Sequence, residues 1–132
     1  MNIPSEHDEQ VQLITWARLN AWKYPELKML LAIPNGGHRH KSVAGKLRAE
    51  GVRAGVPDLF LPVPAGDYCG MWVEMKRRKR STTSPEQKEW IAALLANHYH
   101  VIVAKGWEEA RDGIEEYLAL IEDHLPPGLV DL

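Results

Sequence analysis

The chain has 132 residues, enough for one domain with a hydrophobic core of its own. Its net charge of −2 gives no overall attraction to a polyanion, and its single cysteine, Cys69, excludes an internal disulfide framework and fits a reducing, cytoplasmic compartment. No apolar run reaches the roughly 18 residues of a membrane span, and the acidic, polar N-terminus is unlike a signal peptide. We therefore expect one domain over residues 1–132, with its core at about 6–118 and a short tail at 125–132.

The first expected element is a helix from Ser5 to about Trp22. Ser5 suits the N-cap, and three acids follow in the first turn, where the helix dipole favours anions. On a helical wheel Glu6 lines up with the apolar side, Glu9 lies at its edge and Asp8 lies opposite. We therefore expect Glu6, with Glu9 as the alternative, to face into the domain. The other interpretation is that all three acids only stabilise the start of the helix.

Two further elements precede the central part of the chain. Residues 29–34 form a short apolar run that predicts a strand, and the turn-forming Asn35-Gly36-Gly37 follows it. Residues 41–50 predict a short basic helix that ends at Gly51. We expect its apolar side to face the core, and this side consists of Val43, Ala44 and Leu47.

Residues 58–63 and 70–76 predict two strands that a short turn joins into an antiparallel hairpin. Residues i and i+2 of a strand share a face, so Glu74 and Lys76 project together. Hairpin pairing sets the start of the first strand against the end of the second, which brings Asp58 to the same edge of the sheet. The alternative is a Glu–Lys pair on an exposed strand and an aspartate that only caps a turn.

A helix, a strand and a second helix complete the chain. Ser84-Pro85-Glu86-Gln87 begins the first helix with a capping-box pattern, and its expected buried stripe is Trp90, Ile91, Leu94 and Leu95. Residues 100–104 predict a strand parallel to 70–76, because a helix connects the two. The last helix runs from Trp107 to about His124. The order α β α β β α β α predicts an α/β fold with a mixed sheet, hairpin plus parallel strand, flanked by helices.

The hairpin carries the residues that point to chemistry. Asp58, Glu74 and the backbone carbonyl of Met75 offer the hard oxygen atoms that Mg²⁺ prefers. A metal held there lowers the pKa of a bound water and offsets charge on a scissile phosphate, and Lys76 beside it would orient the water and stabilise the transition state. Cationic residues gather in the surrounding segments, and local potential steers a polyanion more than net charge does. The candidate DNA contacts are Arg39, Lys41, Lys46, Arg48, Arg53, Arg77, Arg78, Lys79 and Arg80.

Pro57-Asp58 … Glu74-Met75-Lys76 resembles the signature of the PD-(D/E)xK nucleases, and the details are closer to the VRR-type branch (the VRR-NUC domain). The similarity runs from about Glu6 to Tyr117 and includes Ala32-Ile33-Pro34-Asn35-Gly36-Gly37, Gly55-Val56-Pro57-Asp58-Leu59 and Ser84-Pro85-Glu86-Gln87 … Trp90. This resemblance implies a restriction-endonuclease-like fold and DNA cleavage that depends on Mg²⁺ or Mn²⁺. It implies the following roles: Asp58 and Glu74 as metal ligands, Lys76 as the catalytic lysine, Gln87 as a supporting glutamine and Glu6 as the acid of the first helix.

The resemblance also implies partners and a setting. Stand-alone members look like small phage or bacterial proteins, and they are similar to Holliday junction resolvases, which act as homodimers on branched DNA. We therefore expect a homodimer in the cytoplasm of a bacterial or phage-infected cell. Two alternatives stay open: a flap or single-strand nuclease with the same site, and a DNA-binding module that does not cleave. Gln87, in turn, could serve only the start of its own helix.

Overall fold

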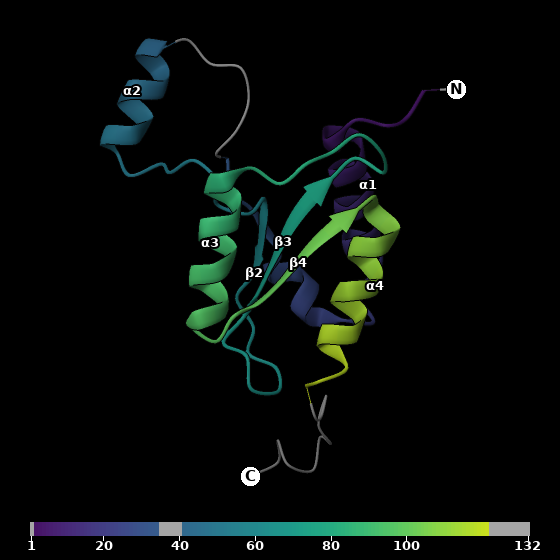
Figure 1. Cartoon of the computed structure of the whole chain (residues 1–132). Coiled ribbons are helices and arrows are strands. Elements are labelled where there is room, and N and C mark those ends of the chain that lie inside the picture. Colours follow the sequence, from purple (N-terminus) through teal and green to yellow (C-terminus); the bar gives the residue numbers. More distant parts are fainter. Residues whose placement is uncertain (1, 35–40, 122–132) are drawn as a thin grey trace.

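The computed structural model describes residues 2–34 and 41–121. Its elements are α1 (Glu6–Leu19), the 3-10 helix η1 (Pro25–Met29), β1 (Leu31–Ala32), α2 (Lys41–Ala49), β2 (Leu59–Leu61), β3 (Met71–Lys76), α3 (Pro85–Ala96), β4 (His100–Lys105) and α4 (Trp107–Leu118). The strands form one mixed sheet in the order β1-β2-β3-β4, antiparallel from β1 to β3 and parallel between β3 and β4. Helix α3 lies on one side of the sheet, and α1 and α4 lie on the other (Figure 1). The predicted mixed α/β fold is confirmed.

The hydrophobic core fills the space between the sheet and the pair α1 and α4. Strand β3 alternates as predicted, because Met71, Val73 and Met75 are 0% exposed and point into this core. The other core members that are 0% exposed are Leu13 of α1, Leu59 and Leu61 of β2, and Ala110, Ile114 and Leu118 of α4. It follows that Trp72, Glu74 and Lys76 lie on the opposite face of β3, the side on which α3 lies.

Helix α2 stands apart from the rest of the protein (Figure 1). Within the described residues it contacts no other element, and the side chain of Val43 is 43% exposed. The prediction that Val43, Ala44 and Leu47 face the core is therefore wrong. An amphipathic pattern shows that a helix has an apolar side, but it does not show that the chain brings this side back to the core.

The run 29–34 and the buried stripe of α3 also differ from the prediction. In the run 29–34, Met29 closes η1, and only the two residues of β1 pair with β2. In α3, Leu94 is the buried residue and Leu95 is 51% exposed, so the predicted four-residue stripe is wrong for Leu95. The reason is that α3 lies mainly along β4, so that only a narrow part of the helix is covered. No helix in the part of the chain that the structure describes is long and apolar enough to cross a membrane.

Candidate active site

Asp58 lies where β2 and β3 separate. The antiparallel register of these strands ends at the pair Leu59 and Val73. Beyond this pair, the Met75 N–H donates to Asp58 Oδ2 at 2.7 Å, so an aspartate side chain continues the ladder in place of a backbone carbonyl. This bond fixes one carboxylate oxygen and turns the Asp58 side chain towards the end of β3. The predicted meeting of Asp58 with Glu74 at one edge of the sheet follows from this local geometry.

Glu74, Lys76 and Gln87 form a closed triangle of contacts. Lys76 Nζ lies 3.5 Å from Glu74 Oε2 and donates to Gln87 Oε1 at 2.9 Å. The Gln87 Nε2 group donates to Glu74 Oε2, also at 2.9 Å. Glu74 and Lys76 are only 2% and 5% exposed. Lysine and glutamate are rarely buried to this extent unless they are paired, so the triangle is a built arrangement and not a surface ion pair.

Gln87 also belongs to the capping box of α3. Its backbone N–H donates to Ser84 Oγ at 3.1 Å, and the Ser84 N–H donates to Gln87 Oε1 at 2.9 Å. One oxygen atom therefore accepts from the helix start and from Lys76. The two interpretations of Gln87, a helix cap and a support for the site, are compatible. Ser84 thus belongs to the site through Gln87, and the capping-box pattern was the signal in the sequence that could have shown this.

Burial raises the proton affinity of both carboxylates. Burial and the charge of Asp58 raise the pKa of Glu74 to about 8, against the opposing effect of Lys76. Burial also raises the pKa of Asp58, while its hydrogen bonds from the Met75 N–H and with Glu74 act in the opposite direction. The buried Glu74 and the half-buried Asp58 share a hydrogen bond and have the ammonium group of Lys76 beside them. The local charge therefore favours a proton or a cation between Asp58 and Glu74.

The donor set fits a hard divalent cation. Mg²⁺ is commonly held by one or two carboxylates and keeps several waters. Among the described residues no group of three or more His, Cys, Asp or Glu side chains could hold a metal, so the side-chain ligands available at this place are Asp58 and Glu74. A further ligand from the backbone carbonyl of Met75 stays a prediction.

The acids of α1 are buried in the reverse of the predicted order. Glu6 is exposed, whereas Glu9 is 1% exposed, because Glu9 continues the i, i+4 stripe of Leu13 and Ala17. Glu9 Oε1 accepts from the Trp107 N–H at 3.0 Å, and Glu9 Oε2 accepts from Arg78 at 2.9 Å. Both oxygens are thus used to join α1 to α4 and to the loop after β3.

Glu6 nevertheless lies within electrostatic reach of the site. Its charge is among the causes that raise the pKa of Glu74, after burial and the charge of Asp58. Glu9 is not among these causes. Of the two acids weighed from the sequence, Glu6 is the one whose charge acts on the carboxylate pair, although it does so from the surface.

The predicted DNA contacts fall into three groups. Arg78 is held by Glu9 and Glu108, and Arg77 donates to the Ile3 carbonyl at 3.5 Å. Arg39 lies outside the described residues, as does the side chain of Lys41. The remaining cations are exposed, and they are Lys46, Arg48, Arg53, Lys79 and Arg80. In the basic run after β3, Arg77 and Arg78 are thus tethered by hydrogen bonds, although Arg78 is also exposed, and Lys79 and Arg80 are exposed.

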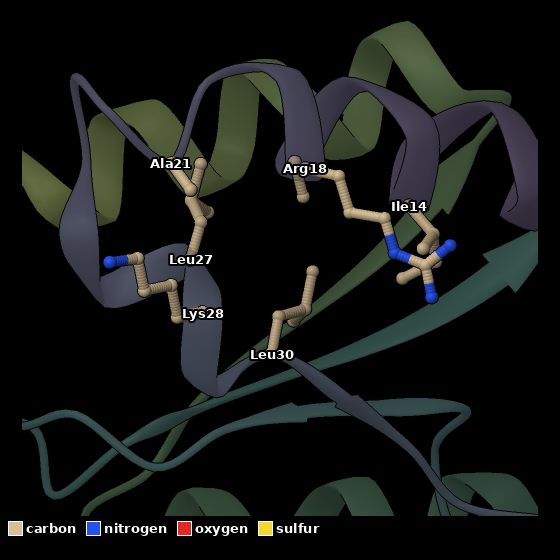
Figure 2. A pocket seen from close by; sticks show the side chains of 7 residues that line it. Ile14, Arg18, Ala21, Leu27, Lys28 and Leu30 are labelled. Atoms are coloured by element: carbon tan, nitrogen blue, oxygen red, sulfur yellow. The ribbon is translucent and has the colours of Figure 1, made fainter.

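A cavity of about 380 Å³ lies between α1 and η1 (Figure 2). Its lining includes Ile14, Arg18, Leu27 and Leu30, and none of the candidate catalytic residues. This cavity is therefore separate from the candidate active site at the end of β3.

The mixed sheet carries an aspartate, a glutamate and a lysine at the place where two of its strands separate. This is the organisation of the PD-(D/E)xK nucleases. The chain belongs to the VRR-NUC domain family, whose model matches residues 2–108. Among solved structures it is similar to a chain described as a VRR_NUC domain protein, with a TM-score of 0.79 and 29% sequence identity over 91% of this chain and 93% of that chain. No curated protein matches the sequence. Family membership indicates a nuclease that acts on DNA, and nucleases of this family generally depend on a divalent metal.

Proposed function

We propose that this chain is a divalent-metal-dependent DNA endonuclease with Asp58, Glu74 and Lys76 as its catalytic group. The observation that carries the proposal is the buried triangle of Glu74, Lys76 and Gln87 beside Asp58. Burying these charges costs stability unless every group is paired. Because the site keeps these charges together in spite of this cost, a catalytic role explains it more simply than a structural role does.

Asp58 and Glu74 would hold Mg²⁺ or Mn²⁺, with the carbonyl of Met75 as a further oxygen ligand. A bound cation of this kind supplies Lewis acidity and a more acidic water. The protein's own part is to hold Lys76. An ammonium group has three donors, and in this site Gln87 Oε1 and Glu74 Oε2 engage two of them. The third is left to orient a water or a phosphate oxygen.

Glu6 and Gln87 would act from the helices on either side of the sheet. Gln87 fixes the position of Lys76 through a 2.9 Å hydrogen bond. Glu6 contributes negative charge, which favours a cation at the carboxylate pair. The exposed cations Lys46, Arg48, Arg53, Lys79 and Arg80 would bind phosphates together with Arg39, Lys41, Arg77 and Arg78. Contacts of this type position the backbone and carry no sequence information directly.

We further propose that the enzyme is a homodimer that resolves branched DNA in the manner of a Holliday junction resolvase. A C₂ dimer presents two equivalent sites, and a four-way junction offers two equivalent strands. A flap or single-strand nuclease with the same site is the second candidate. It is favoured by the partly exposed aromatic residues Phe60 and Trp72, which lie beside the carboxylates.

The test is cleavage of a panel of labelled DNAs: four-way junction, flap, splayed arms, duplex and single strand. Cleavage should need Mg²⁺ or Mn²⁺ and stop with EDTA. Lys76→Met should lower the rate by at least about 10²-fold. Lys105→Met is the matched control, because Lys105 is the β4 partner of Lys76 in the register but is exposed. If the two variants cut equally well, the site is assigned wrongly. Light scattering of the free protein measures the oligomeric state, and a monomer that still cuts junctions symmetrically would contradict the dimer.

A further inference from the structure

Arg78 is fixed at the inner end of its guanidinium group and exposed at the outer end. Its Nε–H donates at 2.9 Å to Glu9 Oε2, and Glu9 is 1% exposed. The stem of the side chain lies across Gly106, where an added Cβ would be 3.1 Å from both Cγ and Nε of Arg78. The Arg78 side chain as a whole is nevertheless 45% exposed. The guanidinium group is therefore held in one place while part of it faces solvent.

The two carboxylates that contact Arg78 differ in how firmly they are held. Glu9 is buried, and its second oxygen accepts from the Trp107 N–H at 3.0 Å. Glu108 is 49% exposed and accepts from Nη2 of Arg78. Its side chain makes no second hydrogen bond within the described residues. An exposed ion pair contributes little stability, whereas breaking a buried one is costly, so Glu108 can leave Arg78 and Glu9 cannot.

The guanidinium group of Arg78 has donors to spare. An arginine side chain carries five N–H groups, and Glu9 and Glu108 engage two of them. No other acceptor forms a hydrogen bond with Arg78 in the part of the chain that the structure describes. Two parallel N–H groups of an arginine match two oxygens of a phosphate. Once Glu108 leaves, the outer edge of the group, formed by Nη1 and Nη2, is free for such a bidentate contact.

Arg78 lies beside the candidate active site. It follows Lys76 by two residues, so their Cα atoms are at most about 7 Å apart. The N–H of Gly106, the residue that the Arg78 stem crosses, donates to the Lys76 carbonyl at 3.0 Å. The place of Arg78 is thus tied to the end of β3. A DNA strand with a phosphate at Lys76 therefore passes within reach of the outer edge of Arg78.

We propose that Arg78 is an oriented phosphate contact of this nuclease and that Glu108 occupies its outer edge in the DNA-free protein. The inference rests on the proposed nuclease function and goes beyond it, because it makes one acid of α4 a competitor of the DNA backbone. When DNA binds, two phosphate oxygens replace the Glu108 carboxylate, and the bond from Arg78 Nε to Glu9 stays. Glu108 thus weakens the binding of any DNA that does not bring a phosphate to this position.

The experiment measures affinity by fluorescence anisotropy in the Lys76→Met background with Mg²⁺, on the DNA that the parent protein cuts best. Glu108→Gln keeps the size of the side chain and removes its charge. It should bind this DNA about threefold more tightly, within the range for an exposed ion pair that no longer has to be broken. Glu109→Gln is the matched control, because Glu109 lies in the same helix turn but accepts from the Lys105 N–H and not from Arg78. It should bind DNA as the parent does.

A second background separates competition for Arg78 from general repulsion between Glu108 and DNA. Arg78→Lys keeps a positive charge beside Glu9 but lacks the fork that holds Glu108 as well. In this background Glu108→Gln should have no effect on affinity, and thermal unfolding checks that each variant is folded. An equal gain in both backgrounds would overturn the inference. If the parent cuts DNA while Glu108→Gln binds no more tightly, the inference fails and the nuclease proposal stands. If the parent neither binds nor cuts DNA, both fail.

Discussion

Replacing Glu74 by glutamine should stabilise the metal-free protein, and the gain should grow with pH. Burial and the charge of Asp58 raise the pKa of Glu74 from 4.5 to about 8, so the folded protein binds this proton more tightly than the unfolded chain does. The contribution of Glu74 to stability is therefore fully present below pH 4.5 and is lost as the pH rises to about 8. At about 1.4 kcal/mol for each pH unit, the loss is at most about 5 kcal/mol in all and about 3 kcal/mol by pH 7.

Glutamine keeps the size of the side chain and an oxygen acceptor for Gln87 but carries no titrating group. Urea denaturation in EDTA at pH 5, 6, 7 and 8, followed by tryptophan fluorescence, should show Glu74→Gln within about 1 kcal/mol of the parent at pH 5 and about 3 kcal/mol more stable at pH 7. Glu86→Gln, an exposed change on α3, controls for the loss of one negative charge. A difference that does not depend on pH, or a Glu74→Gln protein less stable than the parent at pH 7, would refute the reasoning.

Two further predictions concern residues that support the site. Glu9→Gln should lower the free energy of unfolding by about 2 kcal/mol, because it weakens buried hydrogen bonds to Arg78 and the Trp107 N–H. The exposed Glu6→Gln should leave the free energy of unfolding unchanged in the same denaturation assay. Equal losses in the two variants would contradict the structural role given to Glu9. Gly55→Ala should slow cleavage, because a Cβ at this position would lie 2.6 Å from the backbone of Glu86 and displace the first turn of α3. Gly51→Ala is the matched control, because Gly51 also has a positive φ (+104°) but has open space around it. If both variants cut DNA at the same rate, Gly55 has no special role in positioning α3.

The local patterns along the chain predicted most of the fold. Alternation placed Met71, Val73 and Met75 in the core, and the hairpin argument brought Asp58 to Glu74. These predictions succeeded because strand periodicity and short turns are decided by neighbours in the sequence.

What the sequence could not show depends on contacts between distant segments. The helical wheel ranked Glu6 as more buried than Glu9, because the wheel averages all apolar residues, whereas packing against α4 selected the stripe of Leu13 and Ala17. The use of Arg78 as a partner of Glu9 joins residues 69 positions apart, and no local pattern marks such a pair. The position of α2 away from the other elements could not be predicted either, because an apolar side of a helix does not indicate which surface it contacts.

The shared acceptor atom of Gln87 has a consequence for the effect of heat. Helix ends open locally at a lower free-energy cost than the whole protein unfolds. If the first turn of α3 opens, the Ser84 N–H and Lys76 Nζ lose the same oxygen at once, while β3 and the core on the far face of the sheet stay intact. Nuclease activity should therefore decline at a temperature below the global melting transition. The thermal limit of the enzyme is then set by one helix turn and not by its hydrophobic core.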